Sequence, residues 1–323
     1  MRLLVLTLII SLYYSTIFSQ ACCSGGTPLS SNLGIQGLDY QQLEFQLSYD
    51  YNTQRALVSG SQKLDDDRRD RNTHSILLRG SYAFSPKFSF TGVLSYIRQE
   101  EVIESIVGGQ TKTFAEGIGD AVALMQYNLI NTSKLNVVLA GGLTIPIGST
   151  NELDPFTKIT ALHPDMQPGQ GAWDQLLGAN VVIYKVFKPG MSWTNVLTYR
   201  LTSPADRYNG GQEYEFGNEL QLITGLADSY FVGLWVVDPS LLFRYRQTAV
   251  DKVNNVKSAN TGGSWLHLMP GIDIHVGQNW SIGLTGEIPL YRSLKGTQLT
   301  TSSRIRLNLR YTIVPKSDLS IIK

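Results

Sequence analysis

The residues of this chain that could do chemistry are arginines and carboxylates spaced two apart within alternating segments. Arg304, Arg306 and Arg310 share one parity of the last such segment, and apolar residues stand between them. Successive side chains of a β-strand point to opposite faces, so this spacing gives one charged face and one apolar face. A charged face of this kind can pair with neighbouring strands or orient a polar solute that passes along it.

The same parity selects charged residues in the other alternating segments. Because they carry both signs, we expect no strong preference for anions or cations, and both roles, stabilising ion pairs and a charged constriction, stay open. We expect Arg244 and Arg246 beside Glu215 and Glu219, and Arg304 and Arg306 between Glu287 and Glu44. If the alternating segments close into a barrel, the charged face becomes its lumen. The residues predicted to line this lumen and the path of a solute are Arg79, Asp120, Asp174, Arg200, Glu215, Glu219, Arg244, Arg246, Asp273, Glu287, Arg304, Arg306 and Arg310.

The histidines give little support for catalysis. A hydrolytic barrel needs a nucleophile beside a histidine, but the adjacent His74 and Ser75 would point to opposite faces of a strand. His163 lies near Asp165 in a predicted loop, where no nucleophile can be assigned to it. We therefore expect a protein that is not an enzyme and uses no cofactor.

The elements that position these residues are alternating segments that recur about twelve times, with connections that alternate long and short. Such a pattern predicts an all-β fold, a closed antiparallel transmembrane β-barrel of about 12 strands with short periplasmic turns and long extracellular loops. Closure also removes exposed sheet edges. The expected strands are 42–51, 73–84, 87–98, 117–129, 135–147, 172–186, 191–201, 213–226, 230–246, 265–276, 280–291 and 303–313.

Composition agrees with an exported barrel. The chain has 323 residues with 27 Lys and Arg against 26 Asp and Glu, so it lacks the basic charge that nucleic-acid binding requires. Its mean hydropathy is only −0.06, because lumen residues offset lipid-facing ones. After the N-terminus, no run approaches the roughly 18 apolar residues that a spanning helix needs.

The sequence predicts four parts. Residues 1–20 combine a basic start with a short apolar core and are expected to be a signal peptide. Residues 21–40 would be an N-terminal periplasmic segment or a plug in the lumen, 41–315 the barrel, and 316–323 a C-terminal tail. The predicted location is the outer membrane of a Gram-negative cell, with its lipids and the barrel assembly machinery as partners.

The two cysteines, Cys22 and Cys23, are adjacent and follow the expected cleavage site. Consecutive Cα atoms are about 3.8 Å apart, less than the roughly 4.4–6.8 Å of ordinary disulfides, so a bond between them would be strained. Three alternatives remain: a tail with a strained or mixed disulfide, a copper(I) or zinc site, and lipidation of Cys22.

Three motifs in order carry a resemblance to a known family. Residues 117–120 (GIGD) open one strand, 143–148 (LTIPIG) close the next, and 168–174 (PGQGAWD) open a third; 214–219 (YEFGNE) and 296–299 (GTQL) add to the set. Together they resemble outer-membrane transporters named for the meta-pathway of phenol degradation, akin to fatty-acid-transporter-like barrels. The Cys-Cys head and the end of the chain, which lacks a terminal aromatic residue, depart from that pattern.

The resemblance implies passive passage of small, often hydrophobic or aromatic solutes across the outer membrane. Lumen-facing apolar residues suit such a solute: Val93, Val122, Leu124, Val182, Trp265 and Met269. The expected function is thus a channel or transporter. The alternative is a structural or complex-forming barrel with a metal-handling Cys-Cys N-terminus.

Overall fold

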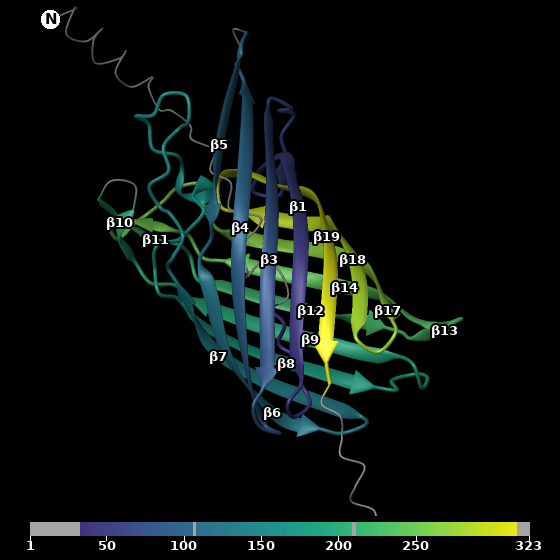
Figure 1. The fold of residues 1–323 in the computed structure, drawn as a ribbon. Helices are drawn as coiled ribbons and strands as arrows, with labels where there is room; N and C mark the ends of the chain where they lie inside the picture. The colour runs from purple at the N-terminus through teal and green to yellow at the C-terminus, as the bar shows by residue number, and fades with distance from the viewer. Residues whose placement is uncertain (1–32, 106–107, 209–210, 315–323) are drawn as a thin grey trace, which may run out of the picture.

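The computed structural model describes residues 33–105, 108–208 and 211–314 as a closed β-barrel (Figure 1). Each barrel strand pairs antiparallel with the next, and the last pairs with the first. This closure confirms the predicted 12-stranded barrel. The strands are β1 (Leu43–Ser59), β3 (Arg69–Ala83), β4 (Phe88–Glu104), β6 (Ala121–Asn131), β7 (Leu135–Ile145), β8 (Gln175–Tyr184), β9 (Ser192–Leu201), β12 (Glu219–Ala227), β14 (Trp235–Thr248), β17 (Gly263–Val276), β18 (Trp280–Leu294) and β19 (Thr297–Ile313).

Shorter elements decorate the ring. β5 (Gln110–Ile118) continues the line of β6 along β4, after a break at Gly119 and Asp120. No helix in the described ranges is long and apolar enough to cross a membrane. The remaining elements are β2 (Gln62–Lys63), the 3₁₀ turn η2 (Pro164–Met166), β13 (Tyr230–Val232) and a separate small sheet of β10 (Ala205–Tyr208), β11 (Gln212–Glu215), β15 (Lys252–Val253) and β16 (Val256–Lys257).

The two faces of the barrel wall differ as the alternation predicts. On β19, Ile305 and Leu307 are exposed, whereas Arg304 and Arg306 are buried in the interior. The same alternation runs along β1 and β4. Apolar side chains on an outer face and charges on an inner face suit a wall in lipid around a polar interior.

Several strands are longer than the sequence predicted. The expected loop 52–72 is largely a hairpin of β1 and β3, held by contacts such as Arg55 Nε to Asp70 Oδ2 at 3.0 Å. The expected loop 99–116 likewise continues as the β4–β5 hairpin (Figure 1). Backbone pairing continues here although apolar alternation has ended, because polar cross-strand pairs also hold a ladder.

One predicted strand, 213–226, is split into β11 and β12. The Gly217 amide donates to Asp251 Oδ1 at 2.8 Å, and a Cβ at Gly217 would lie 2.1 Å from the Ala249 carbonyl oxygen. Only glycine permits this close approach, which turns the chain out of the barrel. Glu215 therefore lies on β11, in the small sheet, rather than in the lumen.

The outer face can be tested at Leu307, which lies within β19. We expect Leu307→Arg to lower the free energy of unfolding by about 2–4 kcal/mol, because it places a charge in lipid. Leu307→Ala is the matched control and should cost clearly less. Urea unfolding from lipid vesicles gives both values, and equal effects would contradict a lipid-facing position.

Candidate functional site: the charged lumen

A belt of arginines and carboxylates crosses the inner face of five consecutive strands, from β14 through β17, β18 and β19 to β1. Arg244 of β14 contacts Glu287 of β18, and Arg304 Nη1 of β19 lies 3.9 Å from Glu287 Oε2. Asp50 of β1 accepts from Arg304 Nε at 2.7 Å and from Arg306 Nε at 2.8 Å. One carboxylate on each side thus holds the arginines of the last strand.

The belt has a second part on β9, β12 and β14. Glu219 Oε2 lies 2.9 Å from Arg246 Nη2 and 3.7 Å from Arg200 Nη2. Arg200 also reaches Asp174 at 3.7 Å. The Arg246 guanidinium lies 5.0 Å from the ring centroid of buried Trp265, a cation–π distance.

Burial makes these pairs interdependent. The belt contains five arginines (200, 244, 246, 304, 306) and four carboxylates (50, 174, 219, 287), nearly all with side chains at most a tenth exposed. Removing one partner of a buried pair leaves an uncompensated charge, at a cost of about 3–5 kcal/mol. The belt is therefore close to electrically neutral, with five positive charges against four negative ones.

Arg306 and Glu44, which were expected to lie beside each other, take different partners. Arg306 pairs with Asp50 because the register sets those two residues opposite each other. Glu44 instead accepts from Arg79 Nη2 at 2.6 Å, and Arg79 also donates to Gln46 at 2.7 Å. Strand order alone could not distinguish Glu44 from Asp50, since both have inward parity on β1.

Asp120 holds the extracellular loop after β7 rather than a strand neighbour. Its carboxylate accepts from the amides of Gly148, at 3.0 Å, and Gln170, at 2.6 Å. Arg200 Nη1 donates to Gln170 Oε1 at 2.6 Å, so the loop is tied to the belt. Gly169 packs directly on Gly148, where a Cβ would lie 2.5 Å from a backbone atom.

The same loop is tied at its η2 turn. Arg71 Nη1 lies 2.6 Å from Asp165 Oδ2, and the Tyr208 hydroxyl donates to the Pro164 carbonyl at 2.8 Å. Burial raises the pKa of Tyr208, so this hydroxyl stays a donor at any physiological pH. Arg71, the last residue of the charged run 65–71, is buried. The loop is thus attached to the barrel both at Asp120 and at its η2 turn.

Some predicted site residues lie outside the belt. Glu215 pairs on the small sheet with Lys252 Nζ at 2.9 Å, and its expected place beside Arg244 was wrong. Asp273 and Arg310 meet at 3.9 Å with partly exposed side chains, toward the periplasmic end. Within the described residues, no cluster could hold a metal ion, and Cys22 and Cys23 lie outside those residues.

The chain before β1 lies inside the barrel. Leu33 and Ile35 are buried in one cluster with Val93, Val122 and Leu124, residues expected to line the lumen. A Cβ on Gly178 of β8 would lie 2.3 Å from Ile35 Cδ1. This segment, residues 33–38, thus covers the apolar patch around Val93, Val122 and Leu124.

Amide side chains of the barrel wall hold the backbone of residues 33–38. Asn180 Nδ2 donates to the Ile35 carbonyl at 2.6 Å, Gln126 Nε2 to the Gly34 carbonyl at 3.2 Å, and Asn128 Nδ2 to the Leu38 carbonyl at 3.2 Å. Sequence reasoning missed these three residues because it selected charges. Their inward parity on β6 and β8 was the available signal.

Comparison with solved structures identifies the class of fold. An outer-membrane channel from Pseudomonas putida F1 superposes with a TM-score of 0.68 at 11% identity, covering 88% of this chain and 99% of that one. A Pseudomonas aeruginosa FadL homologue gives 0.42 at 12% identity over 84% and 90%, and the transport unit of the Escherichia coli autotransporter AIDA-I gives 0.48 at 10% over 89% and 95%. These two scores are too low to carry an argument.

No model of a protein family and no curated protein sequence matches the chain. The fold is nevertheless that of an outer-membrane β-barrel, and the protein is located in the outer membrane, as predicted.

The belt can be tested at Glu287. We expect Glu287→Gln to lower the free energy of unfolding by about 3–5 kcal/mol, because it leaves Arg244 and Arg304 buried without their shared carboxylate. The matched control is Glu215→Gln, which breaks a partly exposed pair on the small sheet, worth about 0–1 kcal/mol for a pair near the surface. Urea unfolding gives both values, and the belt would be dispensable if the two substitutions cost the same.

Proposed function

We propose that the protein is an outer-membrane channel for passive passage of small, partly hydrophobic or aromatic solutes. The observation that carries the proposal is that residues 33–38 lie inside the barrel, where they pack on apolar side chains of the wall and accept hydrogen bonds from its amide side chains. We also propose a relationship to the transporters named for the meta-pathway of phenol degradation. The P. putida neighbour is itself described as a channel, which supports a role other than catalysis.

Barrel size supports a restricted pore. Twelve strands lie between the eight of fully packed barrels and the sixteen or more of open porins. The space inside the barrel is large enough for a short peptide, and residues 33–38 occupy part of it. Their removal would open a path and leave the backbone pairing of the wall strands intact.

The inner surface suits a solute that has both an apolar part and a polar part. Val93, Val122 and Leu124 would form an apolar patch once Leu33 and Ile35 move away. The charge belt stands across the same lumen and would orient polar groups of the solute. The mixed signs of the belt argue against a simple ion channel.

The energy of closure can be bounded. Exposing three buried side chains (Leu33, Ile35, Leu38) costs about 1.5–3 kcal/mol each. Each lost hydrogen bond adds roughly 0.5–1.5 kcal/mol. Full release of the segment thus costs several kcal/mol, so the intact protein is expected to be closed most of the time.

The division of the N-terminal region follows from this proposal. Residues 21–40 would end in the plug, and the segment 1–20 would be removed as a signal peptide. The cover formed by the loop after β7, which Asp120 anchors, would form the second barrier on the extracellular side. A solute would then pass two barriers in series.

The test is deletion of residues 33–38. In planar bilayers we expect the variant to conduct several-fold more than the intact protein, and in liposomes to admit small phenols faster, because the lumen has lost its filling. The matched control is Asp120→Asn, which loosens only the extracellular cover and should leave a smaller increase. If the deletion variant folds but passes neither ions nor phenols, the channel proposal is wrong.

A further inference from the structure

The barrel wall has an open seam between β18 and β19. Their backbone pairing runs from Trp280–Tyr311 to Glu287–Arg304 and ends there. Both strands continue, β18 to Leu294 and β19 back to Thr297, where a two-residue turn joins them. The two strands therefore diverge over roughly six residues, about 20 Å of strand, before they meet again.

Each strand follows its other neighbour through this region. β18 stays paired with β17 up to Gly263–Leu294, but with a register shift between Leu266 and His267. β19 stays paired with β1, again with register shifts near Gln54. Pro289 lies in the seam and has no amide hydrogen to donate across it. Register shifts against both outer neighbours, together with Pro289, thus favour the separation of β18 from β19.

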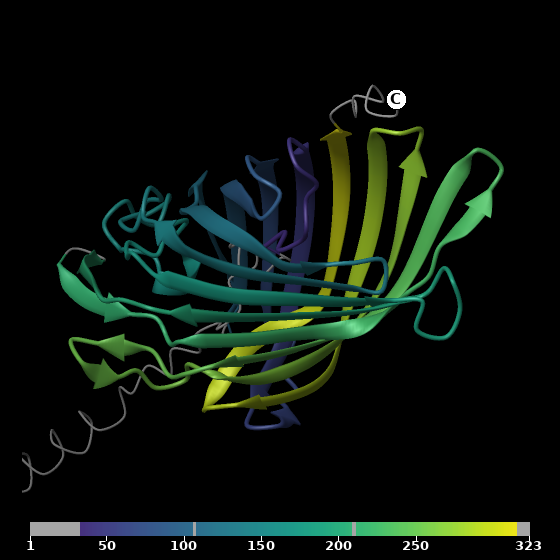
Figure 2. The same cartoon turned by 90° about the horizontal axis from the view of Figure 1, so that it is seen from below.

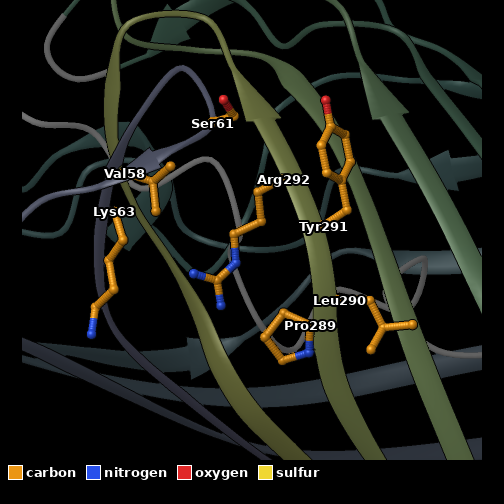
Figure 3. A pocket seen from close by; sticks show the side chains of 7 residues that line it. All are labelled: Val58, Ser61, Lys63, Pro289, Leu290, Tyr291 and Arg292. Atoms are coloured by element: carbon orange, nitrogen blue, oxygen red, sulfur yellow. The ribbon is translucent and has the colours of Figure 1, made fainter.

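A pocket of about 290 Å³ occupies the seam (Figure 3). Pro289, Leu290 and Tyr291 form its apolar side, and Leu290 and Tyr291 are about half exposed at the outer surface, at 52% and 54%. The polar side comes from Arg292 of β18 and from Ser61 and Lys63 of the β1–β2 hairpin. None of the seven residues lining the pocket is acidic.

Arg292 lies between the diverging strands. Its side chain leaves β18 and points into the space toward β19 (Figure 3), where Nη2 donates to the Thr301 carbonyl at 2.7 Å. This bond places the guanidinium in the seam. A guanidinium group can bind phosphate oxygens at two points, and the nearby lysine adds a second charge.

The position of the pocket along the barrel axis indicates which kind of molecule could bind there. β1 and β18 both begin at the periplasmic end, so Arg292 and the β1–β2 hairpin lie toward the extracellular end of the wall. At that level the exposed Leu290 and Tyr291 would meet the headgroups of the outer leaflet. Two cations beside an exposed Leu and Tyr match the border between a phosphorylated headgroup and its acyl chains.

We propose that the seam pocket binds the phosphorylated headgroup of an outer-leaflet lipid. Arg292 and Lys63 hold the phosphate, and Pro289, Leu290 and Tyr291 contact the first part of an acyl chain. The bound lipid fills the gap in the backbone pairing from outside. This site is independent of passage through the lumen and would exist in a barrel that transports nothing.

The test is lipid binding to the intact protein in detergent, followed by native mass spectrometry. The probe is a bisphosphorylated glycolipid of the outer leaflet, with its enzymatically dephosphorylated form as the comparison lipid. We expect Lys63→Gln/Arg292→Gln to weaken binding of the phosphorylated lipid about thirtyfold, the product of roughly five- to sixfold for each cation. The dephosphorylated lipid should bind weakly to intact protein and variant alike.

Two variants keep the test decisive. Lys63→Gln alone leaves the Arg292 contact across the seam in place and should still weaken binding about fivefold. The matched control is Arg98→Gln/Lys112→Gln, an exposed cation pair on β4 and β5 that should change nothing. Heat-dependent gel mobility checks that each barrel is folded.

Three results would overturn the proposal. They are an equal loss in the Arg98/Lys112 control, unchanged binding in both pocket variants, or equal affinity for the phosphorylated and dephosphorylated lipids. Inorganic phosphate is the remaining arm: if it binds the pocket as tightly as the lipid does, the site is for free phosphate and not for a headgroup.

Discussion

The constraint on which this structure depends is that a backbone in lipid must satisfy its own hydrogen bonds. An unpaired amide or carbonyl in the hydrocarbon region costs several kcal/mol, so a sheet there has to close on itself. The pairing of β19 with β1, from Leu43–Ile313 to Ser59–Thr297, is what completes the ring. The seam between β18 and β19 respects the same rule, because it lies toward the extracellular end, where water and headgroups can serve as partners.

Closure forces a second requirement onto the interior. Inward parity sends charged and amide side chains into a narrow space, and each must find a partner there. The strand register decides which partners meet: Asp50 stands opposite Arg306, while Glu287 stands opposite Arg304. Three amide side chains, Gln126, Asn128 and Asn180, bind the backbone of residues 33–38 instead. The N-terminal segment thus satisfies polar groups of the wall as well as covering its apolar patch.

Much of the fold could be predicted because lipid outside and polar groups inside impose a strict period of two. The twelve strands, their faces and the inward position of most predicted charges follow from that period, as on β19 with Arg304 and Arg306. The ends of the strands do not, because above the membrane either face can be polar and the alternation carries no information. Hence the β1–β3 hairpin extends through a region that looked like a loop.

The candidate site was less predictable, because partners depend on contacts that parity does not encode. Glu215 has the parity of a lumen residue, but Gly217 turns the chain outward two positions later. Asp120 has the right parity as well, yet it binds amides of a loop that folds back over the barrel. Both exceptions occur where a glycine allows one backbone to touch another. In this barrel, glycines at close backbone contacts decide where the wall ends and where its covers begin.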